Sequence, residues 1–290
     1  MADRRCLLAV HAHPDDESSK GPATVARYHD QGVHTVLVCC TGGEEGDILN
    51  PAMDRPEVRA NLAEHRRAEL AAATSIIGYD EVVMLGYRDS GMPDSEANKH
   101  PESFAMAPLE EAVGRLVGII RRIRPQVIVT YPDEQSRYPH PDHLRVHEIS
   151  AVAFDAAADP AAYPEAGEAF APAKMYYTVW SVARMRAIHE KFLELGLQSP
   201  YSGERVARML EGPLPTFSTT IDVTGYEDIR TEALRAHATQ IDPNSRMWFG
   251  LPPEVQKAIP STDDYQLARS RVGPLDAHED DLFAGVPEAG

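Results

Sequence analysis

Near its N-terminus the chain reads Leu7-Leu8-Ala9-Val10-His11-Ala12-His13-Pro14-Asp15-Asp16-Glu17, an apolar run that leads directly into histidines and carboxylates. A short apolar run that ends in polar residues predicts a buried strand over 7–12. A second polar cluster, His140-Pro141-Asp142-His143, follows another apolar run after the eight-residue loop 132–139. Because ligands of open α/β sheets bind beyond the carboxyl ends of the strands, we expect the two clusters to meet at one edge of a sheet.

The first half of the chain alternates apolar runs with helical periodicity. Strands are expected at 7–12, 34–41, 81–86 and 126–131, and helices at 21–31, 57–77, 108–123 and 142–157. Near-continuous apolar strands separated by helices are typical of a parallel sheet that is covered on both faces. The pattern therefore predicts an α/β fold with a mostly parallel sheet flanked by helices.

The second half of the chain predicts an extension of the same domain. An irregular crossing rich in Ala and Pro at 155–173 precedes further expected elements: strands at 174–180 and 213–223, and helices at 182–196 and 226–241. No linker separates two domains. We expect a metal-binding core over 1–160, a C-terminal α+β extension over 161–275 that packs on the core and completes the substrate pocket, and a flexible acidic tail over 276–290.

Composition and charge exclude several classes of partner. The 290 residues carry a net charge of −17, which disfavours nucleic acid and other polyanions, because phosphate binding needs clustered Lys and Arg. Cys6, Cys39 and Cys40 form no disulfide framework and indicate small buried side chains in a reducing compartment. No apolar run approaches the roughly 20 residues of a bilayer span, so we expect a cytoplasmic protein without a membrane partner. The sequence predicts no particular oligomeric state.

The two polar clusters supply the side chains of a hydrolytic metal site. His13, Asp16 and His143 form a plausible ligand set for Zn²⁺ with water in the fourth position, which leaves Asp15 as a base. His140 and His143 bracket a Pro-Asp turn, so one imidazole binds metal while the other faces the substrate. Three other interpretations compete. The aspartates can cap helices, the zinc can be purely structural, or the sheet can be a non-catalytic nucleotide- or sugar-binding module. Two clusters at two strand ends favour the catalytic metal, and no glycine-rich phosphate loop is present.

These residues resemble the LmbE-like (PIG-L) family of zinc-dependent N-deacetylases and amidases that act on aminosugar conjugates. The family motifs are His-Pro-Asp-Asp-Glu at 13–17 and His-Pro-Asp-His at 140–143. Lys20, the stretch 48–54 (ILNPAMD), 236–243 (AHATQIDP) and 267–271 (LARSR) further resemble the subgroup of mycothiol S-conjugate amidases. The resemblance covers nearly the whole chain and implies a Rossmann-like core.

The resemblance also implies roles for individual residues. It implies zinc, or alternatively Fe²⁺, held by His13, Asp16 and His143, with Asp15 as general base. His140 matches an acid or oxyanion stabiliser oriented by Asp142. The remaining matches are a mobile tyrosine at Tyr138 that closes over the site, and Arg66, Asp89 and Glu45, which hold the glucosaminyl-inositol moiety. Lys20 matches the amidase subgroup, and we expect it to affect which substrate is preferred.

The implied reaction is hydrolysis of the cysteinyl-glucosamine amide of a small thiol-sugar conjugate. Its products are a mercapturate, that is, an N-acetylcysteine S-conjugate, and glucosaminyl-inositol, in detoxification or antibiotic biosynthesis. The closest rival reaction is the removal of acetate from N-acetylglucosaminyl-inositol in mycothiol biosynthesis. One departure concerns Ser136-Arg137, where the subgroup carries small residues; a bulky cation beside the gate bears on which S-substituent is accepted.

Overall fold

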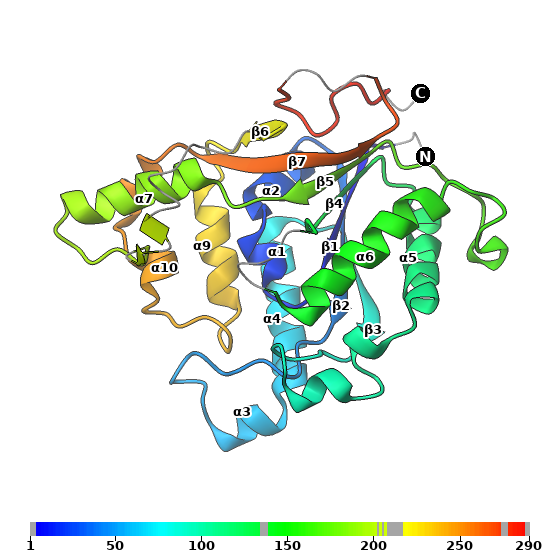
Figure 1. The fold of residues 1–290 in the computed structure, drawn as a ribbon. Coiled ribbons are helices and arrows are strands. Elements are labelled where there is room, and N and C mark those ends of the chain that lie inside the picture. The colour runs from blue at the N-terminus through cyan, green and yellow to red at the C-terminus, as the bar shows by residue number, and fades with distance from the viewer. Residues whose placement is uncertain are drawn as a thin grey trace.

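A single mixed sheet forms the centre of the molecule (Figure 1). The computed structural model describes residues 4–133, 139–201, 203–204, 206–207, 217–273 and 278–287. Within them the strands are β1 (Cys6–His11), β2 (His34–Thr41), β3 (Glu81–Tyr87), β4 (Val127–Thr130), β5 (Lys174–Thr178), β6 (Thr219–Asp222) and β7 (Thr262–Ser270). Their order in the sheet is β3-β2-β1-β4-β5-β7-β6. The first five of these are parallel, whereas β7 runs antiparallel to both β5 and β6.

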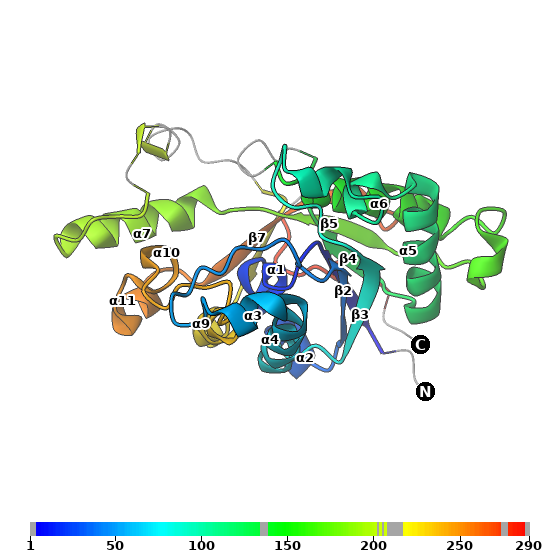
Figure 2. The ribbon, with the colours of Figure 1, turned by 90° about the horizontal axis from the view of Figure 1, so that it is seen from below.

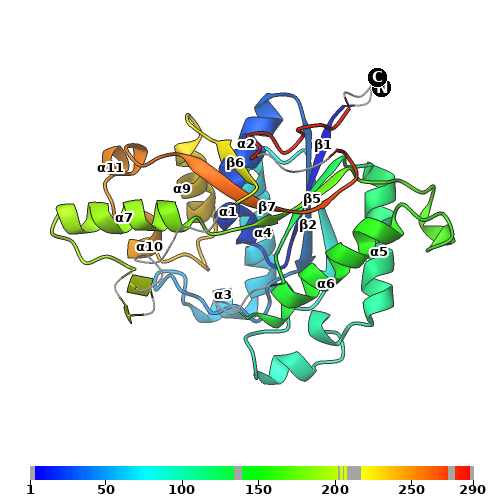
Figure 3. The same cartoon turned by 45° about the horizontal axis from the view of Figure 1, so that its top comes forward.

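Helices cover both faces of this sheet. The longer ones are α2 (Pro22–Asp30), α4 (Leu62–Ile77), α5 (Leu109–Ile123), α6 (Pro141–Ala156), α7 (Val182–Glu194) and α9 (Glu227–Ala236). The shorter ones are α1 (Asp16–Ser19), α3 (Pro56–Ala60), α10 (Arg246–Phe249), α11 (Pro253–Lys257) and the 3₁₀ turns η1 (Glu96–Lys99), η2 (Phe104–Met106) and η3 (Pro164–Ala166). Figure 2 shows α5 and α6 on one face of the sheet and α2, α4 and α9 on the other. In Figure 3, α7, α10 and α11 project beyond the core on the side of β7.

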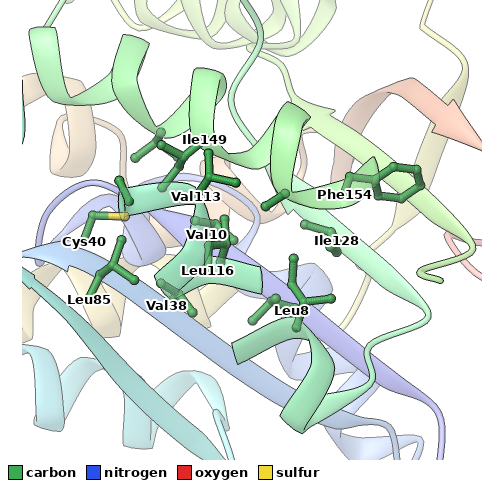
Figure 4. Packing of buried hydrophobic residues seen from close by; sticks show 14 of the residues in the cluster. Leu8, Val10, Val38, Cys40, Leu85, Val113, Leu116, Ile128, Ile149 and Phe154 are labelled. Atoms are coloured by element: carbon green, nitrogen blue, oxygen red, sulfur yellow. The ribbon is translucent and has the colours of Figure 1, made fainter. Parts of the chain in front are cut away.

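The core follows the two-residue period of the strands. Leu8 and Val10 of β1 point toward α5 and α6, where they pack with Leu116 and Ile149 (Figure 4). Leu7, in contrast, belongs to the cluster beneath α2, α4 and α9. Because successive strand residues face opposite sides, a central strand that is buried on both faces must be apolar throughout.

The cysteines obey the same alternation. Cys40 lies in the cluster under α5 and α6, whereas Cys39 packs with Ala9 and Leu70 on the opposite face. All three cysteines are buried thiols without a disulfide. Burial raises the pKa of Cys39 and of Cys40 well above the ordinary value, so both thiols are protonated and serve as small apolar side chains.

The predicted α/β fold with its C-terminal extension is confirmed, with differences at particular elements. The helix expected over 57–77 is divided into α3 and α4 because Asn61 has a non-helical backbone. β7 was not predicted, because Asp263 and Asp264 in its first half break the apolar pattern. Both carboxylates are buried and hydrogen-bonded, Asp263 to Thr24 and Asp264 to Thr220. Across the described ranges, no helix combines the length and apolar character that a bilayer span requires.

The expectation of a flexible tail is wrong for residues 278–287. Leu282 and Phe283 are fully buried against the face that α2 covers. Glu279 accepts hydrogen bonds from Lys174 Nζ at 2.6 Å and from Tyr176 Oη at 2.7 Å. The acidic composition of the tail does not predict this packing, because the ammonium group that Glu279 neutralises lies more than a hundred residues earlier in the sequence.

We expect Glu279→Ala to lower the free energy of unfolding by about 3–5 kcal/mol, because it leaves the fully buried Lys174 ammonium uncompensated. Urea unfolding of the variant measures this loss. The matched control is Glu194→Ala, which breaks the surface pair with Lys191 and should cost at most about 1 kcal/mol. Equal, small losses in both variants would show that the tail contributes little to stability.

Candidate active site

Two histidines and an aspartate converge at the carboxyl edge of the sheet. Asp16 Oδ2 lies 3.5 Å from His13 Nδ1 and 3.3 Å from His143 Nε2. All three side chains are buried, and their ligand atoms lie within 4.8 Å of one another. The two clusters therefore meet as the strand-end argument predicts. A buried set of two imidazoles and one carboxylate fits a divalent metal with an open coordination position.

The opposite edge of the His13 ring supports the same interpretation. His13 Nε2 lies 3.1 Å from Asp142 Oδ2, so Nδ1 is the nitrogen that faces Asp16. A metal-binding imidazole commonly donates its second N–H to a carboxylate, which fixes the ring and raises its basicity. Asp142 is itself held by Ser90, which donates from its backbone N–H at 3.0 Å and from its hydroxyl. No sequence pattern indicates this role for Ser90.

The hydrogen-bond donors around Asp16 stabilise its carboxylate as an anion. Its Oδ2 accepts hydrogen bonds from the backbone N–H of His13 at 3.0 Å and from Tyr131 Oη at 2.7 Å, while Lys20 Nζ donates to Oδ1. Burial acts to raise the pKa of Asp16, but the charges of Lys20 and His143 outweigh it and hold that pKa well below its usual value. The carboxylate is ionised at neutral pH, which metal ligation requires.

Arg66 holds Asp15, the expected base. The guanidinium of Arg66 is buried and donates to Asp15 Oδ2 at 2.9 Å, to Gly43 O at 2.6 Å and to the carbonyl oxygen of Pro14. The resemblance implies a sugar contact for Arg66. In this structure its hydrogen-bond partners are Pro14 and Asp15 of the metal-binding turn and Gly43, which follows β2.

The backbone of this turn is strained. Asp15 has a φ of 111°, in the left-handed region that costs a non-glycine residue roughly 1–3 kcal/mol. Burial raises the pKa of the Asp15 carboxyl, Arg66 opposes that change, and the charge of Asp16 adds to it. A carboxylate with a raised pKa that is held in a fixed position is suited to accept a proton.

A buried ion pair behind the turn was missed by sequence reasoning. Glu17 Oε2 accepts the Asp15 backbone N–H at 2.9 Å, and Glu17 Oε1 lies 2.6 Å from His237 Nε2. Neither side chain of the pair is exposed. Despite burial, the charge of Glu17 raises the pKa of His237. The pair connects the turn that carries Asp15 to the end of α9. The only sequence signal for it is that His237 lies within the 236–243 motif.

His140 lies beside the metal-binding atoms in a defined orientation. Its ring centroid is 4.5 Å from that of His13, and its Nδ1 accepts the backbone N–H of Asp142 at 3.2 Å. Asp142 thus contacts His140 through its backbone N–H, while its carboxylate contacts His13. With Nδ1 as acceptor, the neutral imidazole carries its proton on Nε2. Burial, followed by the influence of His13, lowers the pKa of His140 to about 4.

The remaining predicted residues differ in their positions. Asp89 is buried, with Oδ1 3.6 Å from His13 Nε2, and it caps its own turn by accepting the Gly91 N–H at 2.8 Å. Glu45 instead forms an ion pair with Arg88. Tyr138 lies outside the described residues, as does the Ser136-Arg137 departure.

Comparison with known proteins agrees with this geometry. The sequence profile described as PIG-L, GlcNAc-PI de-N-acetylase, matches residues 8–154. The chain is 45% identical to a mycothiol S-conjugate amidase of Streptomyces coelicolor, over 99% of each protein. It is 40% identical to a 1D-myo-inositol 2-acetamido-2-deoxy-alpha-D-glucopyranoside deacetylase of Geodermatophilus obscurus, over 99% of this chain and 100% of that protein. Both names denote hydrolases of amide bonds.

Solved structures share the fold at much lower identity. The N,N'-diacetylchitobiose deacetylase of Pyrococcus horikoshii superimposes with a TM-score of 0.62 at 17% identity, over 92% of this chain and 84% of that one. GalB, a 4-carboxy-2-hydroxymuconate hydratase of Pseudomonas, superimposes with a TM-score of 0.61 at 18% identity, over 93% and 98%. Since a hydratase and a deacetylase both have this fold, the fold alone does not specify the reaction.

Proposed function

The chain belongs to the PIG-L family of amide hydrolases, and on that premise we propose that it is a zinc-dependent mycothiol S-conjugate amidase. It would hydrolyse the amide between the cysteinyl carboxyl and the glucosamine, and so release a mercapturate and glucosaminyl-inositol. The observation that carries hydrolysis is the buried His13, Asp16 and His143 set with Asp15 fixed beside it. The 45% identity to the Streptomyces coelicolor amidase, over 99% of each protein, supports the choice of substrate.

The metal would be held by His13, Asp16 and His143. When bound, it supplies polarisation of the amide carbonyl and a more acidic attacking water. Imidazole and carboxylate ligands suit zinc and also ferrous iron, so metal analysis of the purified protein identifies the native ion.

The protein's own groups would then move the protons. Asp15, held by Arg66, accepts the proton of the attacking water. His140 donates from Nε2–H to the tetrahedral oxyanion, since its Nδ1 is engaged by the Asp142 N–H. The leaving amine needs a proton, and Asp15, which has just gained one, delivers it. Because the single ring proton of neutral His140 is used to bind the oxyanion, Asp15 is favoured over His140 as the acid that protonates the leaving amine.

A second candidate is the biosynthetic deacetylase, which several relatives of about 40% identity are named for. Both reactions cleave an amide on the same glucosamine nitrogen and differ only in the acyl group. The deciding experiment measures kcat/KM of the purified protein for a mycothiol S-conjugate and for N-acetylglucosaminyl-inositol. We expect the higher value for the conjugate; a higher value for the acetamide would assign the deacetylase instead.

Lys20 is the residue that we expect to affect this ratio. Its ammonium contacts Asp16, and its side chain also lines a pocket beside the metal-binding turn. A hydrogen bond from this charged donor to a carbonyl of the cysteinyl arm would be worth about 1.5–3 kcal/mol. Lys20→Ala should therefore lower kcat/KM for the conjugate roughly 10–100-fold more than for the acetamide. Equal losses on both substrates would show that Lys20 acts only by positioning Asp16.

A further inference from the structure

The metal-binding residues lie between two hollows, of which only the one on the β7 side is lined by tryptophans. On the β3 side, a groove of about 600 Å³ begins at Pro14 and Glu44, and its walls carry charged side chains that include Arg67, Arg88 and Glu102. On the β5 and β7 side, a smaller pocket begins at Lys20, whose ammonium touches Asp16. β1 lies between these sides in the strand order. An amide that is cleaved at the centre would extend one substituent in each direction.

One wall of the pocket on the β7 side is apolar and aromatic. Its volume is about 110 Å³, whereas one water molecule needs roughly 10–15 Å³ by the same measure. Trp180 and Trp248 both line it, with ring centroids 6.1 Å apart and planes tilted by 39°. Met185, Ile188, Phe192, Met247 and Leu251 complete the apolar wall. The pocket is built by α9, which covers the sheet, and by α7 and α10, which project beyond the core in Figure 3.

Several charged groups that line this pocket have hydrogen-bond partners within the protein. Arg230 donates to Asp263 at 2.7 Å, and Asp263 also accepts from Thr24. Asp264 accepts from Thr220 at 2.8 Å. Arg184 and Arg246, which also line the pocket, donate to Thr262 O and to Gln198 Oε1. The two tryptophans supply the aromatic surface beside these paired groups, and Trp180 is 42% exposed. Aromatic rings prefer offset or edge-to-face partners, so a tilted pair of rings suits a flat apolar group.

Resting on the proposed amidase function, we propose that this pocket binds the S-substituent of the conjugate and selects bulky aromatic groups over small ones. The groove with charged walls suits the hydroxyl-rich glucosaminyl-inositol, and the pocket lined by tryptophans suits the group on sulfur. The orientation follows from the position of Trp180 and Trp248, which line the pocket and not the groove. It also gives Lys20 a place at the junction between the cysteinyl arm and its substituent.

Binding can be observed without catalysis, because Trp180 and Trp248 are the only tryptophans of the chain. Intrinsic fluorescence of the wild-type protein is titrated with N-acetyl-S-benzylcysteine and N-acetyl-S-methylcysteine, which are product-type ligands. We expect a saturable change with the benzyl compound at a Kd at least about tenfold below that of the methyl compound. Equal affinities, or no change with either ligand, would overturn the proposal.

Kinetic measurements on variants provide a second test of the proposal. Trp248→Ala should lower kcat/KM for a benzyl conjugate of mycothiol roughly 10–100-fold and leave the methyl conjugate within about threefold. Trp248→Phe should retain most of the preference. The matched control, Leu197→Ala, removes an exposed apolar side chain of the same extension and should change neither value. A loss shared by both conjugates would contradict selection by the pocket.

The fluorescence titration and the kinetic measurements together distinguish a failure of this proposal from a failure of the proposed function. If the enzyme cleaves both conjugates without preference, the pocket assignment fails and the amidase assignment stands. If it cleaves only N-acetylglucosaminyl-inositol, the amidase assignment fails, and the fluorescence titration still decides whether the pocket binds an aromatic thioether.

Discussion

Asp15→Asn should lower turnover by roughly 10²–10⁴-fold while the bound metal stays at the wild-type level. The substitution keeps the shape of the side chain and removes its capacity to accept a proton. Asn also tolerates the left-handed backbone of this position, so the turn should persist. The measurements are kcat for the conjugate and metal content by elemental analysis of the same preparation.

Asp94→Asn is the matched control for this variant. Asp94 is likewise an aspartate with a left-handed backbone, at a φ of 65°, but it is exposed and lies outside the metal-binding cluster. It should retain normal turnover and metal. Near-normal turnover of Asp15→Asn would exclude Asp15 as the essential base, and loss of its metal would show that Asp15 is a ligand.

The main features of the site could be predicted because they depend on local sequence. An apolar run that ends in His-Pro-Asp-Asp-Glu specifies both the strand and the position of its polar residues at the sheet edge. The second cluster follows β4 in the same way, at the start of α6. Two such strand ends suffice to bring His13, Asp16 and His143 together.

The supporting contacts could not be predicted because they join residues that are distant in sequence. Arg66 and Asp15 are 51 positions apart, and Glu17 and His237 are 220 apart. In the sequence, Arg66 reads as one more helix-surface cation and His237 as an isolated imidazole. Only the folded chain shows that one holds the base and the other neutralises a buried glutamate.

β7 illustrates the same limit for the fold. A strand that is recognised by alternating or continuous apolar residues is missed when its inward side chains are carboxylates. Asp263 satisfies its charge with Arg230 of α9 and Thr24 of α2, so the polar strand forms only in the context of these helices. The stable unit is therefore the whole layered arrangement, and β7 has little propensity of its own.

The ligand assignment makes the strongest prediction about metal content. His13→Ala, Asp16→Ala and His143→Ala each remove one of three protein ligands, so each should lose both metal and activity. The loss of metal affinity should exceed the roughly 10–100-fold weakening that we expect for Asp142→Asn, which only disturbs the partner of His13. Competition with a chelator, followed by elemental analysis, ranks the four variants.

His140→Ala provides the internal comparison for this series. His140 lies three residues before His143 and contacts His13, but its Nδ1 is engaged by the backbone N–H of Asp142. If it stabilises the oxyanion, His140→Ala keeps the metal and loses turnover by roughly 10²–10³-fold, the usual effect of removing one such donor. If His140→Ala loses the metal while His143→Ala retains it, the two histidines have the opposite roles. Wild-type metal content in all three ligand variants would mean that the ion, if any, binds elsewhere.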